Sequence, residues 1–478
     1  MNKTSAPILQ QQELTWKCNN NCTFCYNPER CIESFTPRAV DRERNIAVAE
    51  ASVAHGVMAV CPTGGEPLVV GDHFFEILSI YQRAGCYTSI NSNGRLITDA
   101  IAERLAQSGL RSALISIHGL GELHDTMVGI RGAFPETWNG IMRLNEYGVA
   151  VTPNFVATAK NIQGLKDVGE AFAMTSIIKM TVTPFLPSWG SNSHGAYVLL
   201  REHYRAYFEA VRRIRSLGIN IDSTLPIPPC VLIRLFPDEW REYLDVHSPR
   251  VCMAGRSFGV VSPDGQFRAC IQAPYFADYG GSVVENYAAS WSRANDWALP
   301  DLLPDACRDC LALDVCGGGC RTSCLWESKG AVKGRTMYMG DPLTEAQAIL
   351  FKARVVHDVK PAPATRYVLR PDIKVRDEGW GVIVFNPRNQ SFTILSSEAA
   401  QFLPFTGSLS IASEKTAAVL RAMHAIRPVD DNGYNNTAIP DSVSVLPGNV
   451  LLPRLARGLI RKDIVYCLRA DTGERYLF

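Results

Sequence analysis

The chain from about residue 10 to 225 alternates short apolar runs with amphipathic stretches. This alternation predicts repeated strand–helix units around a parallel sheet. The predicted strands cover 57–60, 87–91, 112–117, 149–157 and 178–185. Apolar residues recur at spacings of three and four in the intervening stretches, as they do from Tyr204 to Leu217, where Gly218 ends the predicted helix. We expect the aromatic residues of these helices to lie in the core.

The pattern changes twice further along. A short Pro-rich stretch at 360–365 predicts a linker. Beyond it, alternating apolar residues predict a hairpin over 379–395 with a polar turn, followed by helices over 396–402, 412–424 and 452–460. The chain has 478 residues, which fits about three domains at roughly 100 to 200 residues each. The predicted domains are 1–225, 226–358 and 366–478.

Composition and charge exclude several classes of protein. Lys and Arg number 48 against 47 Asp and Glu, and 46% of residues are hydrophobic, which is typical of a folded chain without bulk phosphate binding. The basic residues near 454–462 fit a solvated helix face, so we expect no nucleic-acid partner. Neither an apolar run near 20 residues nor a secretory signal is visible, so we expect no membrane partner and a cytoplasmic location.

The chain has 15 cysteines. In the reducing cytoplasm they would remain free thiols, so this number indicates that some of them bind metal or do redox chemistry. Many fall in two dense groups more than 200 residues apart. The first group is Cys18, Cys22 and Cys25, in a loop rich in Asn. Three thiolates suit three irons of a [4Fe–4S] cube and leave the fourth iron open. A zinc loop or three structural thiols are the alternatives.

A second motif follows the next predicted strand. That strand runs into Cys61-Pro-Thr-Gly64-Gly65-Glu66-Pro67. Glycines at a strand's carboxyl end let the backbone approach a ligand closely, and a carboxylate there can pair with an amino group. Taken alone, however, Gly-Gly-Glu-Pro is more typical of an ordinary turn.

Together, the Cys-x3-Cys-x2-Cys loop and this turn resemble the radical S-adenosylmethionine (radical SAM) superfamily. The resemblance implies a partial (β/α)6 TIM-type barrel with its ligand site at the carboxyl ends of the strands. It also implies that Cys18, Cys22 and Cys25 hold a [4Fe–4S] cluster whose open iron chelates the methionine part of S-adenosylmethionine. Phe24 would pack on the adenine, and Glu66, in the turn with Gly64 and Gly65, would face the methionine ammonium.

Two further strand ends resemble the ribose-contacting segments of that family. One is Asn91-Ser-Asn93-Gly and the other is Ser116-Ile-His118-Gly. The resemblance implies that Asn93 and Ser116 contact the cofactor. His118 stands where the family usually has Asp, so we favour Ser116 over His118, and a lone His there is more typical of a hydrogen-bonded structural residue.

The second cysteine group has the pattern Cys252-x12-Gly265-x4-Cys270, then Cys307-x2-Cys310-x5-Cys316-x3-Cys320, and finally Cys324. Pro-Asp-Gly265 predicts a hairpin that brings Cys270 near Cys252. The three glycines before Cys320 would let the backbone pass close to inorganic sulfide. The spacing resembles the SPASM domain, the auxiliary-cluster extension of some radical SAM enzymes.

That resemblance implies two further [4Fe–4S] clusters, three in all. The outer cluster would use Cys307, Cys310, Cys316 and Cys324, and the inner one would use Cys252, Cys270 and Cys320. Cys230 is the candidate for a fourth inner ligand, although an open iron there is the alternative. The remaining thiols, expected to be buried hydrophobes, are Cys31, Cys61, Cys86 and Cys467. A pair of structural zincs is the rival for the whole group.

The C-terminal strands and helices resemble the winged helix-turn-helix peptide-recognition element related to the pyrroloquinoline quinone chaperone family. In that case a leader peptide would add as a strand to an exposed sheet edge. A helix-turn-helix is also typical of DNA-binding proteins, but the sequence lacks the dense stripe of basic residues that DNA binding would need.

These resemblances imply an oxygen-sensitive enzyme that forms a 5'-deoxyadenosyl radical and oxidatively modifies a ribosomally made peptide or protein. The expected change is a thioether or carbon–carbon crosslink or a related side-chain oxidation. Its partners would be the precursor peptide and a reductant such as flavodoxin or ferredoxin. The alternatives are an oxidase of a small molecule or haem precursor and a non-catalytic, metal-bound peptide-binding scaffold. No His or carboxylate can be singled out as the catalytic acid or base.

Overall fold

The computed structural model describes most of the first 322 residues and shorter parts of the rest. The described residues are 4–25, 39–185, 201–223, 228–246, 252–273, 281–298, 303, 305–322, 342–355, 367–370, 372–388, 390–396, 426–428, 445–446, 466–468 and 475–477. Cys31 and Cys324 lie outside them, as do the predicted helices over 412–424 and 452–460 and all but the first residue of that over 396–402.

A nine-stranded sheet forms the centre of the molecule, in the order β7-β6-β5-β4-β3-β2-β1-β8-β9. Its strands are β1 (Leu9–Thr15), β2 (Ala59–Gly64), β3 (Tyr87–Ser92), β4 (Ser112–Ser116), β5 (Ala150–Ala157), β6 (Lys179–Pro184), β7 (Asn220–Ser223), β8 (Phe258–Val261) and β9 (Phe267–Arg268). All neighbouring pairs are parallel except β8 and β9. The predicted parallel α/β barrel is therefore confirmed.

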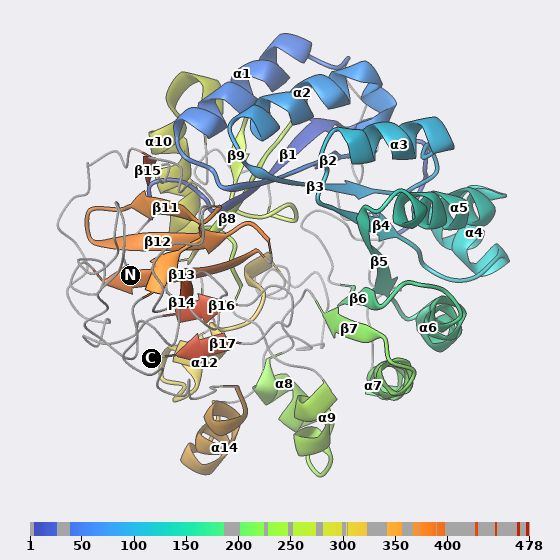
Figure 1. Cartoon of the computed structure of the whole chain (residues 1–478). Coiled ribbons are helices and arrows are strands. Elements are labelled where there is room, and N and C mark those ends of the chain that lie inside the picture. The colour runs from blue at the N-terminus through green and yellow to red at the C-terminus, as the bar shows by residue number, and fades with distance from the viewer. Residues whose placement is uncertain are drawn as a thin grey trace.

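Helices follow the first six strands in turn, so the barrel has the six predicted strand–helix units before β7 (Figure 1). They are α1 (Arg42–Ala54), α2 (Asp72–Arg83), α3 (Asp99–Gln107), α4 (Glu122–Val128), α5 (Ala133–Glu146), α6 (Leu165–Ala173) and α7 (Arg201–Ser216). They form an arc outside the sheet (Figure 1). Local sequence sets their ends: Asp41 caps α1 by accepting the Arg44 N–H at 2.9 Å, and Gly148 turns the chain after α5 with φ of 78°.

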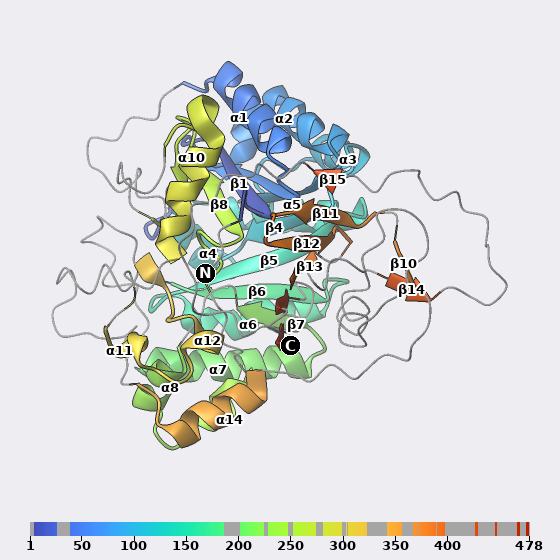
Figure 2. The same ribbon diagram turned by 90° about the vertical axis from the view of Figure 1, so that its left-hand side faces the viewer.

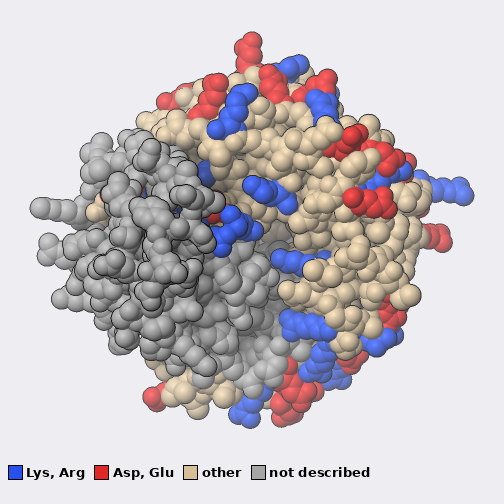
Figure 3. All heavy atoms as spheres, in the orientation of Figure 1, with Lys and Arg blue, Asp and Glu red and all other residues tan. Residues whose placement is uncertain are grey.

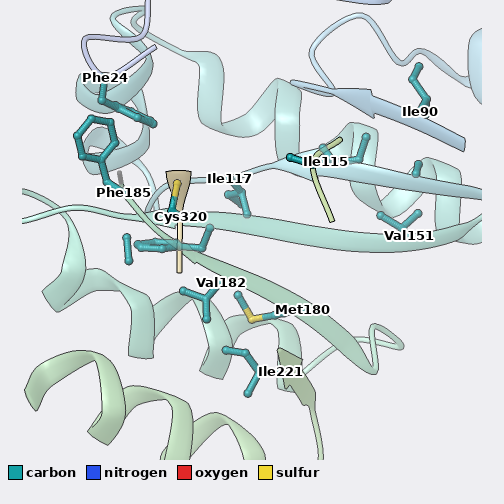
Figure 4. Packing of buried hydrophobic residues seen from close by; sticks show 14 of the residues in the cluster. Phe24, Ile90, Ile115, Ile117, Val151, Met180, Val182, Phe185, Ile221 and Cys320 are labelled. Atoms are coloured by element: carbon teal, nitrogen blue, oxygen red, sulfur yellow. The ribbon is translucent and has the colours of Figure 1, made fainter. Parts of the chain in front are cut away.

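The core lies between the sheet and these helices. Apolar side chains of neighbouring strands interdigitate there, among them Ile115, Val151 and Val182 (Figure 4). The aromatic residues predicted to be core, such as Tyr204 and Phe208, are buried. One predicted strand is shifted along the chain. The sequence predicts it over 57–60, whereas β2 begins at Ala59 and continues to Gly64, because its parallel pairing with β1 extends that far.

The cysteine-rich segment continues the barrel sheet. β8 adds to the free side of β1 in parallel register, and β9 returns from it as the predicted hairpin. Gly265 makes the turn with φ of 79°. The other helices of this part are α8 (Pro229–Leu235), α9 (Trp240–Val246), α10 (Val283–Asn295), α11 (Asp305–Arg308), α12 (Leu313–Cys316) and α14 (Glu345–Val355).

Two smaller sheets complete the described chain. One pairs β10 (Tyr367–Leu369) with β14 (Ile426–Pro428). The other has six strands in the order β15-β11-β12-β13-β16-β17, namely β11 (Lys374–Asp377), β12 (Gly381–Asn386), β13 (Ser391–Ser396), β15 (Val445–Leu446), β16 (Tyr466–Leu468) and β17 (Arg475–Leu477). The antiparallel pair β12–β13 is the hairpin predicted over 379–395.

The six-stranded sheet packs beside the starts of the first barrel strands (Figures 1 and 2). A buried apolar cluster joins the two, composed of Ile8, Met58, Ala59, Tyr87, Ile383, Phe385 and Phe392. Arg376 of β11 donates to the backbone oxygens of Ala6 at 2.7 Å and Gly56 at 2.8 Å. This sheet is therefore docked at the amino-terminal edge of β1 and β2, whereas the cysteine loop follows the carboxyl end of β1.

Charges of both signs are interspersed along the helical rim (Figure 3). Several of them pair, as Arg104 does with Asp72 and Arg213 with Glu170. Among the described residues, no helix is both long and apolar enough to cross a membrane.

Candidate functional site

Four predicted site segments meet at the carboxyl edge of the barrel sheet. β1 leads into the cysteine loop, β2 ends at Gly64, β3 ends at Ser92 and β4 ends at Ser116. Because these strands are parallel neighbours, their carboxyl ends lie along one edge. The sequence therefore predicted correctly which strand ends would come together.

Glu66 is buried between two of these ends. Its carboxylate accepts the Ser92 hydroxyl at 2.8 Å, the Asn93 N–H at 2.7 Å and the Leu68 N–H at 3.2 Å. Burial raises the pKa of Glu66 from 4.5 to about 7, although these hydrogen bonds and the charge of Arg95 act to lower it. Glu66 therefore sits close to half-protonated near neutral pH, so a nearby cation would draw it to the ionised form.

Gly64 and Gly65 leave room for the backbone that leads into the cysteine loop, which a side chain at either position would block. A Cβ at Gly64 would lie 2.3 Å from the Thr15 oxygen, and one at Gly65 would lie 2.1 Å from the Lys17 oxygen. The Glu66 N–H donates to that same Lys17 oxygen at 2.8 Å. The sequence predicts that these glycines admit a ligand, but in the structure the close approach is to the chain itself.

Asn93 ties the end of β3 to the cysteine loop. Its Nδ2 donates to Asn19 Oδ1 at 2.6 Å and lies 3.8 Å from Cys18 Sγ. Arg95 strengthens this link, since it donates to the Asn19 oxygen at 2.6 Å and to Asn20 Oδ1 at 3.0 Å. Sequence reasoning missed Arg95, because nothing distinguishes it from any other Arg near a strand end.

The loop holds Cys18, Cys22 and Cys25 half-buried. Its backbone is anchored on the far side, where the Asn21 N–H donates to the Val128 oxygen at 2.8 Å. Gly129 is needed there, because a Cβ would lie 2.5 Å from the Asn21 oxygen. The three thiols thus lie in one anchored loop that keeps them partly accessible.

Phe24 packs edge-on against His118, with 4.9 Å between the ring centroids. His118 Nδ1 accepts the Val156 N–H at 3.3 Å, which leaves the proton on Nε2. Burial holds the pKa of His118 well below its usual range, so the ring is neutral. His118 is thus the hydrogen-bonded structural residue that the sequence favoured, while Ser116 is half-buried at the end of β4.

Three thiols of the second cysteine group are neighbours. Burial first, and then the negative charges of Cys252 and Cys320, raise the pKa of Cys270 to about 12. Burial also raises the pKa of Cys252, and the charge of Cys320 adds to that rise. This trio is the set predicted for the inner cluster.

Four other thiols form a second set. Burial raises the pKa of Cys316 to about 12, and the charges of Cys230, Cys307 and Cys310 raise it further. The pKa of Cys307 rises to about 11 through burial and the charges of Cys230 and Cys310. The sequence predicts Cys230 for the inner cluster, and in the structure its charge acts on Cys307 and Cys316. Pro228, two residues earlier, packs against Gly319, which lies between Cys316 and Cys320.

Arg321 lies between the two thiol sets. Its positive charge lowers the pKa of both Cys252 and Cys307. The side chain is 3% exposed and donates from one terminal nitrogen to the Gly317 oxygen at 2.7 Å, while its buried Nε has no hydrogen-bond partner among the described residues. Sequence reasoning missed Arg321, because a single Arg after Cys320 carries no signal of its own.

Within the described part of the chain, no three His, Cys, Asp or Glu side chains are arranged to hold a single metal ion.

Residues 13–165, which include the cysteine loop, Glu66, Asn93 and Ser116, match the Radical SAM superfamily. The chain is 25% identical over 346 residues to a PqqA peptide cyclase of Gluconobacter oxydans, covering 68% of this chain and 88% of that protein. It is 24% identical over 331 residues to an AdoMet-dependent heme synthase of Oleidesulfovibrio alaskensis, covering 65% and 81%.

The fold is also similar to that of Streptococcus suis SuiB bound to S-adenosylmethionine. The TM-score is 0.55 at 18% identity, over 71% of this chain and 77% of that one. At this identity the likeness shows the fold alone. The family match identifies residues 13–165 as a radical SAM domain, of an enzyme superfamily that binds S-adenosylmethionine and a [4Fe–4S] cluster.

Proposed function

We propose that this enzyme is a peptide maturase that generates a 5'-deoxyadenosyl radical and oxidatively modifies a ribosomally made peptide or protein. The observation that carries this proposal is the presence of two sets of neighbouring thiols, buried or half-buried, in addition to the cysteine loop. A radical SAM enzyme that only cleaved its cofactor would need the loop alone. Extra clusters suit a reaction in which the substrate is oxidised.

At the first site, Cys18, Cys22 and Cys25 would bind the [4Fe–4S] cluster. Their common loop and partial exposure fit a cube with one iron left open. Glu66 would face the methionine ammonium, because its buried carboxylate lies at these strand ends and an ammonium beside it would favour the ionised form. Asn93 and Ser116 would contact the ribose and Phe24 the adenine, with Gly64 and Gly65 keeping the loop close to β2.

At the second site we propose two auxiliary [4Fe–4S] clusters. The fit rests on the donor chemistry and on Arg321, whose buried Nε lacks an acceptor among the described residues. A cluster sulfide or thiolate would supply that acceptor. When bound, the first cluster and S-adenosylmethionine supply the radical, and the auxiliary clusters accept the electron that a substrate radical loses as its new bond forms.

Substrate recognition would use the C-terminal region, 366–478. The docked sheet lies at the opposite end of β1 from the cysteine loop, and β1 has 7 residues. At about 3.3 Å per residue this separates the two ends by about 23 Å. A peptide held on that sheet would thus need a spacer of several residues to reach the site. Both outer strands of the β11–β13 unit are already paired, so a leader would add to β15 or β17 or displace one of the covering strands.

The PqqA peptide cyclase relative supports a peptide substrate. The runner-up is an oxidase of a small molecule or haem precursor, and the similarity to an AdoMet-dependent heme synthase favours it. The reductant would be a flavodoxin or ferredoxin, and the proposed location is the cytoplasm. The scaffold alternative is not proposed, because the chain belongs to an enzyme superfamily.

The first test is anaerobic reconstitution followed by counting of iron, sulfide and zinc. We expect about twelve irons per chain, for three cubes of four. About four irons would leave only the first cluster and contradict the auxiliary sites, and bound zinc would do the same.

The second test measures 5'-deoxyadenosine. Replacing Cys18, Cys22 and Cys25 by Ala should abolish its formation, while Cys86→Ala, which changes a buried thiol away from all three sets, should retain it. Incubation with candidate precursor peptides and with porphyrin precursors, read by mass spectrometry, then distinguishes the two substrate classes. A peptide that loses a pair of hydrogen atoms supports the maturase, whereas an oxidised porphyrin precursor supports the runner-up.

A further inference from the structure

Two residues in the turn after β3 hold the part of the cysteine loop that directly follows its first thiol. The side-chain amide of Asn93 donates to Asn19 Oδ1 at 2.6 Å. The guanidinium of Arg95 donates to the Asn19 oxygen at 2.6 Å and to Asn20 Oδ1 at 3.0 Å. Asn19 and Asn20 are the two residues after Cys18. The turn therefore fixes the backbone on which Cys18 is carried.

The same contacts direct two N–H groups toward the sulfur of Cys18. The backbone N–H of Asn20 donates to Cys18 Sγ at 3.4 Å, and Asn93 Nδ2 lies 3.8 Å from that sulfur. Arg95 orients both donors. Its backbone N–H donates to Asn93 Oδ1 at 3.0 Å, so the Nδ2 of this amide faces the loop, and its guanidinium holds Asn20 through the side-chain oxygen.

Helix α5 in turn holds Arg95. The Arg95 Nε donates to Glu136 Oε2 at 2.6 Å, and the side chain of Arg95 is only 14% exposed. The helix packs directly on the turn, since a Cβ at Gly140 would lie 2.2 Å from the Gly94 oxygen. Arg95 is therefore fixed from one side by the helix and bonded on the other to the cysteine loop, which is the arrangement of a side chain that sets the position of another group.

Building on the proposed binding of the first cluster by Cys18, Cys22 and Cys25, we infer that Arg95 is a positioning residue for this cluster. It keeps two N–H groups directed at Cys18 Sγ. Hydrogen bonds to a ligand sulfur stabilise the negative charge that a cluster gains on reduction, and they raise its reduction potential. The positive charge of Arg95 acts in the same direction, so Arg95 makes the first cluster easier to reduce.

The test measures the midpoint potential of the first cluster in the iron-loaded full chain, without S-adenosylmethionine. Its electron paramagnetic resonance signal is the one that disappears when Cys18, Cys22 and Cys25 are replaced by Ala. Arg95→Met should lower the potential by about 60 mV, a tenfold change in the equilibrium constant for one-electron reduction. Glu136→Ala weakens the hold on Arg95 and should give a smaller shift in the same direction. If Arg95→Met does not fold, Glu136→Ala decides the same question.

Three further variants separate positioning from charge and from general disturbance. Arg95→Lys keeps the charge but replaces the planar fork by one nitrogen, so it should recover only part of the potential. Arg95→Met and Asn93→Leu should together lower the potential by less than the sum of their separate shifts, because both residues hold Asn19 and act on the same sulfur. The matched control is Arg143→Met. Arg143 donates to the Ile97 oxygen at 3.1 Å in the same connection between β3 and α3, outside the cysteine loop, so its loss should leave the potential unchanged.

Three results would overturn the inference: a wild-type potential in both Arg95→Met and Glu136→Ala, full recovery of the potential in Arg95→Lys, or a shift in Arg143→Met as large as that in Arg95→Met. Each is read on the signal that the loop cysteines support. If every cluster signal instead survives the replacement of Cys18, Cys22 and Cys25, the loop holds no cluster and the proposed function itself fails, so the two failures are distinguishable.

Discussion

Ser92 donates its hydroxyl to the buried carboxylate of Glu66 over 2.8 Å and so joins the end of β3 to the turn after β2. Burial nevertheless raises the pKa of Glu66 from 4.5 to about 7. In the protein without ligand, the protonated form of Glu66 favours the folded state. Its contribution to the free energy of unfolding is complete below about pH 4.5. This contribution is lost as the pH rises through about 7, because the buried carboxylate then ionises.

We therefore predict that the affinity for S-adenosylmethionine depends on pH through Glu66. Its ammonium would bind the ionised carboxylate, so affinity should rise by up to about tenfold between about pH 6 and pH 8. Glu66→Gln should bind more weakly, with a flatter pH profile. Ser92→Ala removes a hydrogen bond to the ionised form and should shift the rise to higher pH. Titration calorimetry measures all three.

Glu76→Gln is the control, because Glu76 is a partly exposed carboxylate on α2 that pairs with Arg42. Its profile should match that of the wild type. An unchanged pH profile in Glu66→Gln would show that Glu66 does not face the ammonium.

Gly65→Ala should displace the cysteine loop. The new Cβ would lie 2.1 Å from the Lys17 oxygen and 2.6 Å from the Trp16 oxygen, so the chain leading to Cys18 must move. We expect loss of about four of about twelve irons and of S-adenosylmethionine binding, with the auxiliary clusters retained.

The matched control is Gly148→Asn. Gly148 has a positive φ of 78°, which Asn tolerates, and no atom lies within 4 Å of its ideal Cβ. The control should keep all its iron. Full iron content in Gly65→Ala would mean that the loop adapts and that this close approach is not required.

Sequence predicted those features that depend on local pattern or on dense spacing. The strand–helix alternation located the barrel, and three thiols in one loop located its site. The contacts that join distant segments were not predictable, because each depends on one ordinary residue. Arg95 reaches the Asn19 oxygen, Pro228 brings Cys230 to Gly319, and Arg376 docks the C-terminal sheet, yet each stands in an unremarkable stretch of sequence.

Arg321 should set the reduction potential of the auxiliary clusters. Its charge acts on thiols of both sets, so it stabilises added negative charge. Arg321→Met should lower the midpoint potential by about 60 mV, which corresponds to about a tenfold change in the equilibrium constant for one-electron reduction. Arg321→Lys should keep part of the shift, and Arg293→Met, at an exposed Arg on α10, should change nothing. Potentiometric titration of the cluster signals measures this, and equal potentials in all variants would contradict the placement of Arg321 between two clusters.

Arg376 should hold the C-terminal sheet on the barrel. Its side chain is fully buried, pairs with Glu378 at 2.7 Å and donates to the oxygens of Ala6, Pro7 and Gly56. Arg376→Met leaves Glu378 buried without its charge partner, so the free energy of unfolding should fall by about 3–5 kcal/mol. Urea denaturation measures the loss, and limited proteolysis shows whether 366–478 becomes accessible first.

The double variant Arg376→Met/Glu378→Gln should recover part of that loss, because it removes the uncompensated charge as well. Arg388→Met breaks a partly exposed pair with Asp372, between the segments just before β11 and just after β12, and should cost no more than about 1 kcal/mol. If Arg376→Met is no more destabilising than Arg388→Met, the sheet is held by its apolar cluster around Ile383 and Phe392, and the ion pair contributes specificity of docking rather than strength.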